Sequence, residues 1–71
     1  MAVYRVVDIV GTSPKGWDDA AKVALTTAHK SLRNLRVAEV AEFDITINDA
    51  GEIEHYRTKL RVSFKYEGGN P

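Results

Sequence analysis

The stretch from Trp17 to Leu35 constrains this chain most, because it has the pattern of one amphipathic helix with a small apolar face. Its apolar residues recur at spacings of three and four, so a period of 3.6 residues gathers them on one side. They are Trp17, Ala20, Ala21, Ala24, Leu25, Ala28, Leu32 and Leu35. Alanines let another element approach closely, so we expect the rest of the chain to wrap around this helix.

Capping and charged residues indicate where this helix begins and ends. Ser13 and Pro14 precede it, and serine can cap the first free backbone N–H groups while proline suits the first turn. Asp18 and Asp19 lie in the first turn, and the expected last turn carries basic side chains, which is the charge order that the helix dipole favours.

Three further stretches have the composition of β-strands. Val3 to Val10 is rich in β-branched residues and ends before Gly11. Arg36 to Asn48 and Ile53 to Tyr66 flank a short polar loop whose glycine suits a hairpin. In the last stretch apolar side chains alternate with basic ones, which is typical of a strand with one buried face.

These elements predict an α+β fold with the order strand, helix, strand, strand. The hairpin makes the second and third strands antiparallel, and a fully antiparallel sheet then has the last strand in its centre. The helix is expected in the concave face of this twisted sheet. The apolar residues of the second strand change phase along it, so a β-bulge is expected near Ala41 to Glu42.

The chain has 71 residues and no cysteine. We expect residues 2–66 to form one domain and residues 67–71 a loose tail. A core of this size is marginal, so contacts with further subunits are expected to help. Ten basic and ten acidic side chains cancel, which argues against nucleic acid or an anionic membrane as a partner. Without a signal-peptide pattern or a run long enough to span a bilayer, we expect a cytoplasmic protein.

No residue pattern predicts catalysis. His29 and His55 lie on different elements, and no Ser, Cys or carboxylate stands at a catalytic spacing from either. The glycines between Gly11 and Gly16 lack the neighbours of a phosphate-binding loop. We therefore expect a protein that is not an enzyme, with both histidines facing solvent.

Four short runs, spread over nearly the whole chain, resemble the dodecins. They are Tyr4-Arg5-Val6-Val7-Asp8-Ile9-Val10-Gly11-Thr12-Ser13-Pro14, Leu32-Arg33-Asn34-Leu35, Ala38-Glu39-Val40 and Leu60-Arg61-Val62-Ser63-Phe64. The resemblance implies a β-α-β-β chain whose sheet wraps the helix, with twelve copies forming a hollow homododecamer. It also implies a cytoplasmic protein that binds and stores flavin without catalytic turnover.

The chain departs from the flavin-binding dodecins at two positions. Val37 stands where the resemblance implies the tryptophan that stacks on flavin, and Arg57 stands where it implies a glutamine that holds the ring edge. Valine offers no ring for stacking. The same departures, together with Trp17 and the Arg36-Val37 pair, resemble a second branch described as calcium dodecins.

Carboxylates on the first two strands are the candidate metal ligands, because calcium prefers several oxygen atoms. They are Asp8, Glu42 and Asp44. Three interpretations stay open: storage of a divalent cation such as calcium, storage of riboflavin, FMN or FAD with Arg57, Lys59 and Arg61 toward the phosphate, and a purely structural shell. Simple ion pairs between these charged strands are the ordinary alternative to a metal site.

Overall fold

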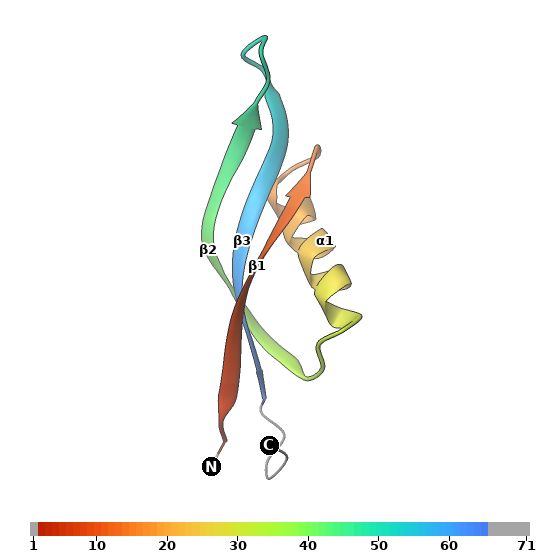
Figure 1. Cartoon of the computed structure of the whole chain (residues 1–71), viewed down its shortest axis with the longest axis vertical. Helices are drawn as coiled ribbons and strands as arrows, with labels where there is room; N and C mark the ends of the chain where they lie inside the picture. Colours follow the sequence, from red (N-terminus) through yellow and green to blue (C-terminus); the bar gives the residue numbers. More distant parts are fainter. Residues whose placement is uncertain (1, 66–71) are drawn as a thin grey trace.

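The computed structural model describes residues 2–65 and contains four elements (Figure 1). They are β1 (Tyr4–Ser13), α1 (Trp17–His29), β2 (Leu35–Ile47) and β3 (Ile53–Lys65). The sheet is antiparallel in the order β1-β3-β2, so the predicted β-α-β-β topology with the last strand in the centre is confirmed. The expected loose tail, residues 67–71, lies outside the described residues.

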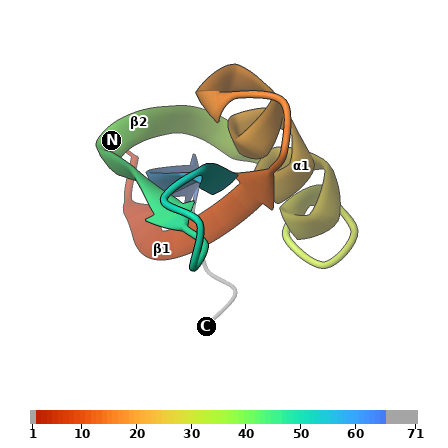
Figure 2. The same cartoon turned by 90° about the horizontal axis from the view of Figure 1, so that it is seen from above.

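The helix packs on one face of the twisted sheet, as Figures 1 and 2 show from two directions. Ala20, Ala24 and Ala28 are its buried residues, and Ala24 meets a core in which Leu60 and Val62 of β3 are almost completely buried. The alanine stripe therefore permits the close approach that the sequence predicted.

β1 lies close to the backbone of α1 at Gly11. A Cβ atom built there would overlap the carbonyl oxygen of Ala20 and would lie 2.8 Å from the Cβ atom of Ala24. The glycine is needed because the neighbouring helix backbone leaves no room for a side chain.

The helix ends at His29, so the prediction that it continues to Leu35 was wrong. The backbone turns after the helix, and Asn34 adopts a positive φ of 60°, a left-handed conformation that redirects the chain into β2. Leu35 is the first residue of β2, yet it still packs against the core. Leu35 matched the helical period because it contacts from β2 the same core that the helix contacts.

The helix begins at Trp17 as predicted, but Ser13 does not cap it. β1 continues past Val10 to Ser13, and the N-cap is Gly16, which makes no side-chain capping bond. The buried Ser13 hydroxyl instead accepts a hydrogen bond from the Lys15 backbone N–H and donates one to the Asp19 carboxylate, at 2.9 and 2.6 Å. Ser13 thus stabilises the loop before the helix.

The β2–β3 hairpin confirms both its predicted loop and its predicted bulge. The pairing register shifts between Val40 and Glu42, where the sequence indicated an irregularity. In the loop, the Asn48 side chain accepts hydrogen bonds from the backbone N–H groups of Ala50 and Glu52, and Gly51 takes a φ of 80°.

A single chain leaves much apolar surface uncovered. The molecule extends over 53 × 20 × 17 Å, and the 13 residues of α1 span only about 20 Å of it. Val6 and Val10 of β1 are each more than half exposed, as are Val37, Val40 and Phe43 of β2. One chain therefore leaves the outer face of β1 uncovered, in line with the expectation that contacts with further subunits help to stabilise the fold.

Candidate functional site

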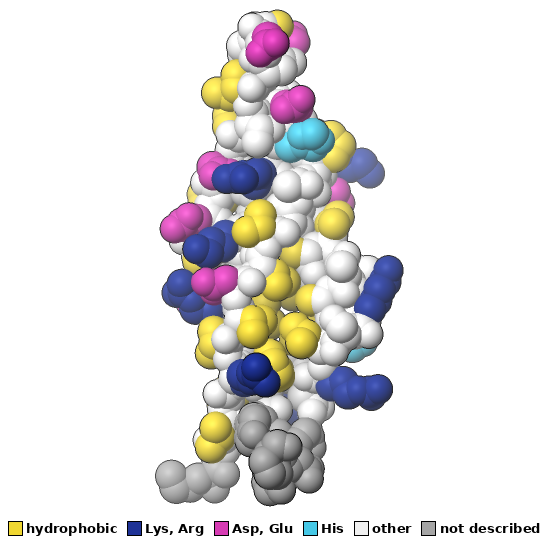
Figure 3. Space-filling view, in the orientation of Figure 1, with side chains coloured by type: hydrophobic (Ala, Val, Ile, Leu, Met, Phe, Trp, Pro, Cys, Tyr) yellow, Lys and Arg dark blue, Asp and Glu magenta, His cyan; other side chains and the backbone are white. Residues whose placement is uncertain are grey.

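The outer face of the sheet, opposite α1, carries a ladder of charged side chains. β3 supplies a central basic row of Arg57, Lys59 and Arg61, and β1 places Asp8 opposite Arg61. On the other side, β2 places its acidic residues opposite the same row: Glu39 with Arg61, Glu42 with Lys59 and Asp44 with Arg57. Acidic and basic side chains are interleaved on the side of the molecule away from the helix (Figure 3).

The bulge in β2 decides which side chains join this ladder. Without the register shift between Val40 and Glu42, strand alternation would turn Glu42 and Asp44 to the same face as Val40, toward the helix. The extra residue turns both carboxylates outward instead, so that they share a face with Glu39.

Asp44 and Arg57 form the best-defined contact of the ladder. The Arg57 Nε and Nη2 atoms donate to the two carboxylate oxygens of Asp44 at 2.7 and 2.8 Å. These hydrogen bonds hold the pKa of the Asp44 carboxyl below its usual range and raise the pKa of Arg57. Because both side chains are about half exposed, solvent weakens the pair.

Asp8 lies in the other half of the ladder. It accepts a hydrogen bond from Arg61 Nε at 3.2 Å, and Lys59 Nζ lies 3.9 Å from its other oxygen. Glu39 approaches Arg61 from β2 at 3.9 Å. The expected ion pairs across strands are therefore present.

The predicted metal ligands fall into two separate places. Glu42 and Asp44 lie two residues apart on the outer face of β2, whereas Asp8 lies on β1 with the whole of β3 between them. Among residues 2–65, no three Asp, Glu or His side chains come close enough to hold a metal ion. Carboxylate oxygens suit calcium in kind, but one chain supplies only part of a coordination shell.

An aromatic cluster fixes the backbone beneath the Asp44–Arg57 pair. The Trp17 indole N–H donates to the Asp44 carbonyl oxygen at 2.9 Å, and the Trp17 ring meets Phe43 and Tyr56 edge-on with centroids 5.0 and 5.1 Å apart. The sequence placed Trp17 on the apolar helix face and among the residues that resemble the calcium dodecins, but it did not indicate a contact with β2. Its link to β2 depends on the tertiary fold, so no local pattern could reveal it.

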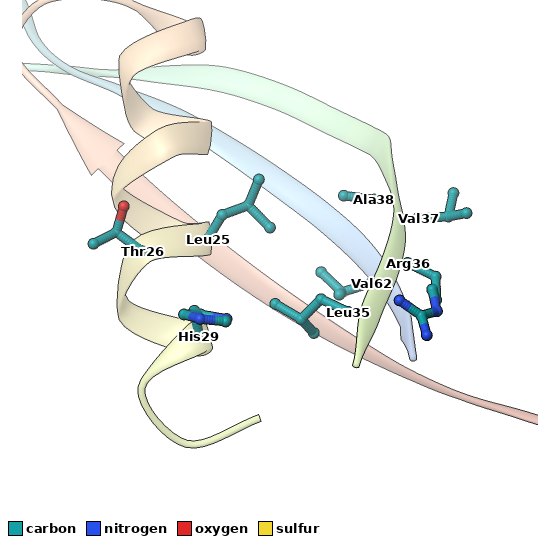
Figure 4. A pocket seen from close by; sticks show the side chains of 8 residues that line it. All are labelled: Leu25, Thr26, His29, Leu35, Arg36, Val37, Ala38 and Val62. Atoms are coloured by element: carbon teal, nitrogen blue, oxygen red, sulfur yellow. The ribbon is translucent and has the colours of Figure 1, made fainter. Parts of the chain in front are cut away.

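Val37 lies beside a groove between the end of α1 and the start of β2. The groove has a volume of about 600 Å³, and Leu25, His29, Leu35, Arg36 and Val62 are among the residues that line it. Ala38 and Val62 point toward the helix in Figure 4, whereas Val37 points away from it. Val37 is 61% exposed, so it presents a small apolar surface where the resemblance implied a stacking ring.

Both histidines lie at the surface. His29 and His55 are both exposed, as predicted, and they lie on α1 and β3 respectively. Within residues 2–65, no helix is both long and apolar enough to cross a membrane.

Comparison with known proteins agrees with this architecture. A family model described as Dodecin matches residues 3–67. The chain belongs to the dodecin family. This dodecin is 48% identical over 71 residues to the calcium dodecin of Mycobacterium tuberculosis, with 100% of this chain and 99% of that protein covered. It is 43% identical over 65 residues to a dodecin of Thermus thermophilus, with 92% and 93% covered.

A solved structure of the Mycobacterium tuberculosis calcium dodecin has the same fold. It matches this dodecin with a TM-score of 0.81 and 48% sequence identity, covering 97% of each chain. That protein is described as a calcium-chelating antigen with a novel calcium-binding site.

Proposed function

We propose that this dodecin forms a homododecameric shell that binds and stores a divalent cation, calcium foremost, and is not an enzyme. The similarity to the calcium dodecin over the whole chain supports this proposal. The uncovered apolar surface of a single chain supports an assembly, because exposed patches of this kind mark protein interfaces.

The observation that carries the cation assignment is the outward pair of carboxylates on β2. The bulge turns Glu42 and Asp44 to one face, where both side chains reach solvent. We propose these two residues as the main ligands. Asp8 lies across β3, so it would contribute from another position or another copy.

Storage of a flavin is the second candidate, and the groove beside Val37 favours it. About 600 Å³ lies within the usual range for small-molecule sites, and His29 and Arg36 give its edge two donors for an anionic group. Against it, Val37 lacks a ring, and base stacking on an aromatic side chain is worth about 1–3 kcal/mol. Arg57, at the position of the implied glutamine, already binds Asp44.

A cytoplasmic location and the absence of nucleic-acid or membrane partners remain predictions. The ladder alternates in sign, so its outer face presents no extended basic surface of the kind that binds phosphate backbones.

Calcium titration by isothermal calorimetry tests the cation assignment. We expect Asp44→Asn to weaken calcium binding about tenfold or more, because it removes a charged oxygen ligand. Asp49→Asn in the hairpin loop is the matched control, since it makes the same chemical change at an exposed acid outside the ladder. Equal affinity of wild type and Asp44→Asn would remove Asp44 from the site.

The double variant Val37→Trp with Arg57→Gln separates cation from flavin storage. If these two side chains alone are missing, the variant quenches the fluorescence of added FMN while the wild type does not. Tight FMN binding by the wild type would make flavin storage the function. A shell that binds neither calcium nor FMN would be purely structural.

A further inference from the structure

Arg57 already binds Asp44, one of the two proposed main cation ligands of the same chain. Of the ion pairs between described residues, only Asp44–Arg57 engages both carboxylate oxygens with two guanidinium nitrogens. Such fork-to-fork pairs are the better-defined class of charge-assisted hydrogen bond. A cation that binds both carboxylate oxygens of Asp44 therefore competes with Arg57 for them.

The backbone holds these two side chains in register. Asp44 and Arg57 are direct partners across the β2–β3 ladder. Each is preceded in sequence by an aromatic residue, Phe43 or Tyr56, whose ring meets Trp17 on the inner face. The aromatic cluster therefore fixes both strands, and opening of the pair needs only side-chain rotation.

The pair is also accessible enough to be opened by a ligand. The side chains of Arg57 and Asp44 are 46% and 54% exposed, and exposed pairs contribute little net stability. A small cavity of about 60 Å³ adjoins them and is lined by Val10, Glu42, Phe43 and Lys59 as well. Neither partner is buried away from solvent.

Glu42 and Lys59 determine which charge lies beside Asp44 or Arg57 when the Asp44–Arg57 pair is opened. Glu42 lies two residues before Asp44 on the same face of β2, and its register partner Lys59 lies two residues after Arg57 on β3. Loss of Arg57 leaves two carboxylates adjacent on one strand. Loss of Asp44 leaves a guanidinium and an ammonium group adjacent on the other.

We propose that Arg57 and Asp44 form a charge lock. This term means an ion pair whose opening decides whether this part of the outer face binds a cation or an anion. The closed pair competes with a cation for Asp44 and with an anion for Arg57. Release of Asp44 gives a stronger site for a divalent cation, and release of Arg57 gives a site for a phosphate-type anion. The cation half of this inference rests on the proposed function, whereas the anion half does not.

Two single variants with opposite expected results test the lock. In calorimetric titrations, Arg57→Gln is expected to bind calcium about three- to tenfold more tightly than wild type, because the competing guanidinium is gone. Asp44→Asn is expected to lose calcium affinity and to bind inorganic phosphate at least about threefold more tightly than wild type. The reversed pair, Asp44→Arg with Arg57→Asp, is expected to show neither gain.

Arg5→Gln is the matched control for net charge. It removes the same group from an exposed position of β1 whose register partner is the uncharged Phe64. Equal gains in calcium affinity for Arg5→Gln and Arg57→Gln would overturn the lock, because overall charge would then explain both. The lock would also be overturned if the wild type binds calcium and Arg57→Gln binds it no more tightly.

Sensitised terbium luminescence locates the ion. Trp17 is the only tryptophan of the chain and contacts the backbone of Asp44, so terbium bound there receives its excitation energy. We expect brighter emission with Arg57→Gln than with wild type. If neither protein binds calcium or terbium, the proposed cation storage fails. The lock is then tested by phosphate binding alone: tighter binding by Asp44→Asn than by wild type supports the lock, and equal binding overturns it.

Discussion

Leu60 and Arg61 are neighbours in β3, yet they lie in opposite environments. Leu60 is 2% exposed and packs under the helix, whereas the Arg61 side chain is 48% exposed and contacts Asp8 and Glu39. The two faces of one strand thus separate two roles. Apolar packing on the inner face holds the fold, and the outer face is free to vary in charge and ligand without endangering that fold.

Substitution of Leu60 and Arg61 should show the difference between the two faces most clearly, because Leu60→Ala has the largest expected effect on stability. We expect Leu60→Ala to lower the free energy of unfolding by about 2–5 kcal/mol, because it leaves a cavity in the core. Arg61→Gln should change it by less than about 1 kcal/mol, since it removes only exposed ion pairs. Urea unfolding followed by circular dichroism measures both, at one protein concentration because assembly affects stability. Similar losses for the two variants would contradict the separation of roles.

Gly11→Ala tests how tightly the inner face is packed. The added methyl group overlaps the Ala20 carbonyl oxygen, so the helix must shift away from β1. We expect a loss of about 1–3 kcal/mol in the same unfolding experiment. Gly16→Ala is the control, because its Cβ would approach only the Asp18 carboxylate, which can rotate. A neutral Gly11→Ala would show that the interface is looser than the structure indicates.

Thr58→Val tests the polar contact within the inner face. The buried Thr58 hydroxyl donates to the Trp17 carbonyl oxygen at 2.8 Å. Valine keeps the shape but removes this buried hydrogen bond, so we expect a loss of about 1–2 kcal/mol. The exposed Thr46 hydroxyl accepts from the His55 backbone N–H, where water can replace it. Thr46→Val should therefore cost less than Thr58→Val.

Acid titration tests the outer face and carries the smallest expected effect on stability. Arg57 lowers the Asp44 pKa in the folded protein, so this pair stabilises the fold at neutral pH. Its contribution is lost as the pH falls through the lowered Asp44 pKa, when the carboxylate is protonated. Carboxyl-carbon NMR should show the Asp44 pKa rise toward its usual value in Arg57→Gln. An unchanged Asp44 pKa would mean that the pair is open in solution.

The inner face was largely predictable from the sequence. Alternation in β3 and the alanine stripe of α1 both point to one apolar core, and the structure confirms the topology that follows from them. The helix end was missed because Leu35 serves the same core from β2. Periodicity reports that a residue faces the core, and it cannot report that the backbone turns at Asn34 first.

For the outer face, the sequence predicted which charges are present but not how they pair. The sequence indicated opposite charges on neighbouring strands, but which acid meets which base depends on the bulge and the hairpin register. Ser13 shows the same limit at the helix start, since its hydroxyl contacts Asp19 rather than capping the helix. The contact of Trp17 with Asp44 joins positions 27 residues apart, beyond the reach of any local pattern.

Native mass spectrometry of untagged protein, with and without added calcium, tests the central claim most directly. We expect a mass of twelve subunits that gains calcium-sized increments and carries no flavin-sized ones, with smaller calcium gains in Asp44→Asn. A dodecamer that retains flavin from purification would contradict cation storage. A stable monomer would contradict the assembly on which the proposal depends.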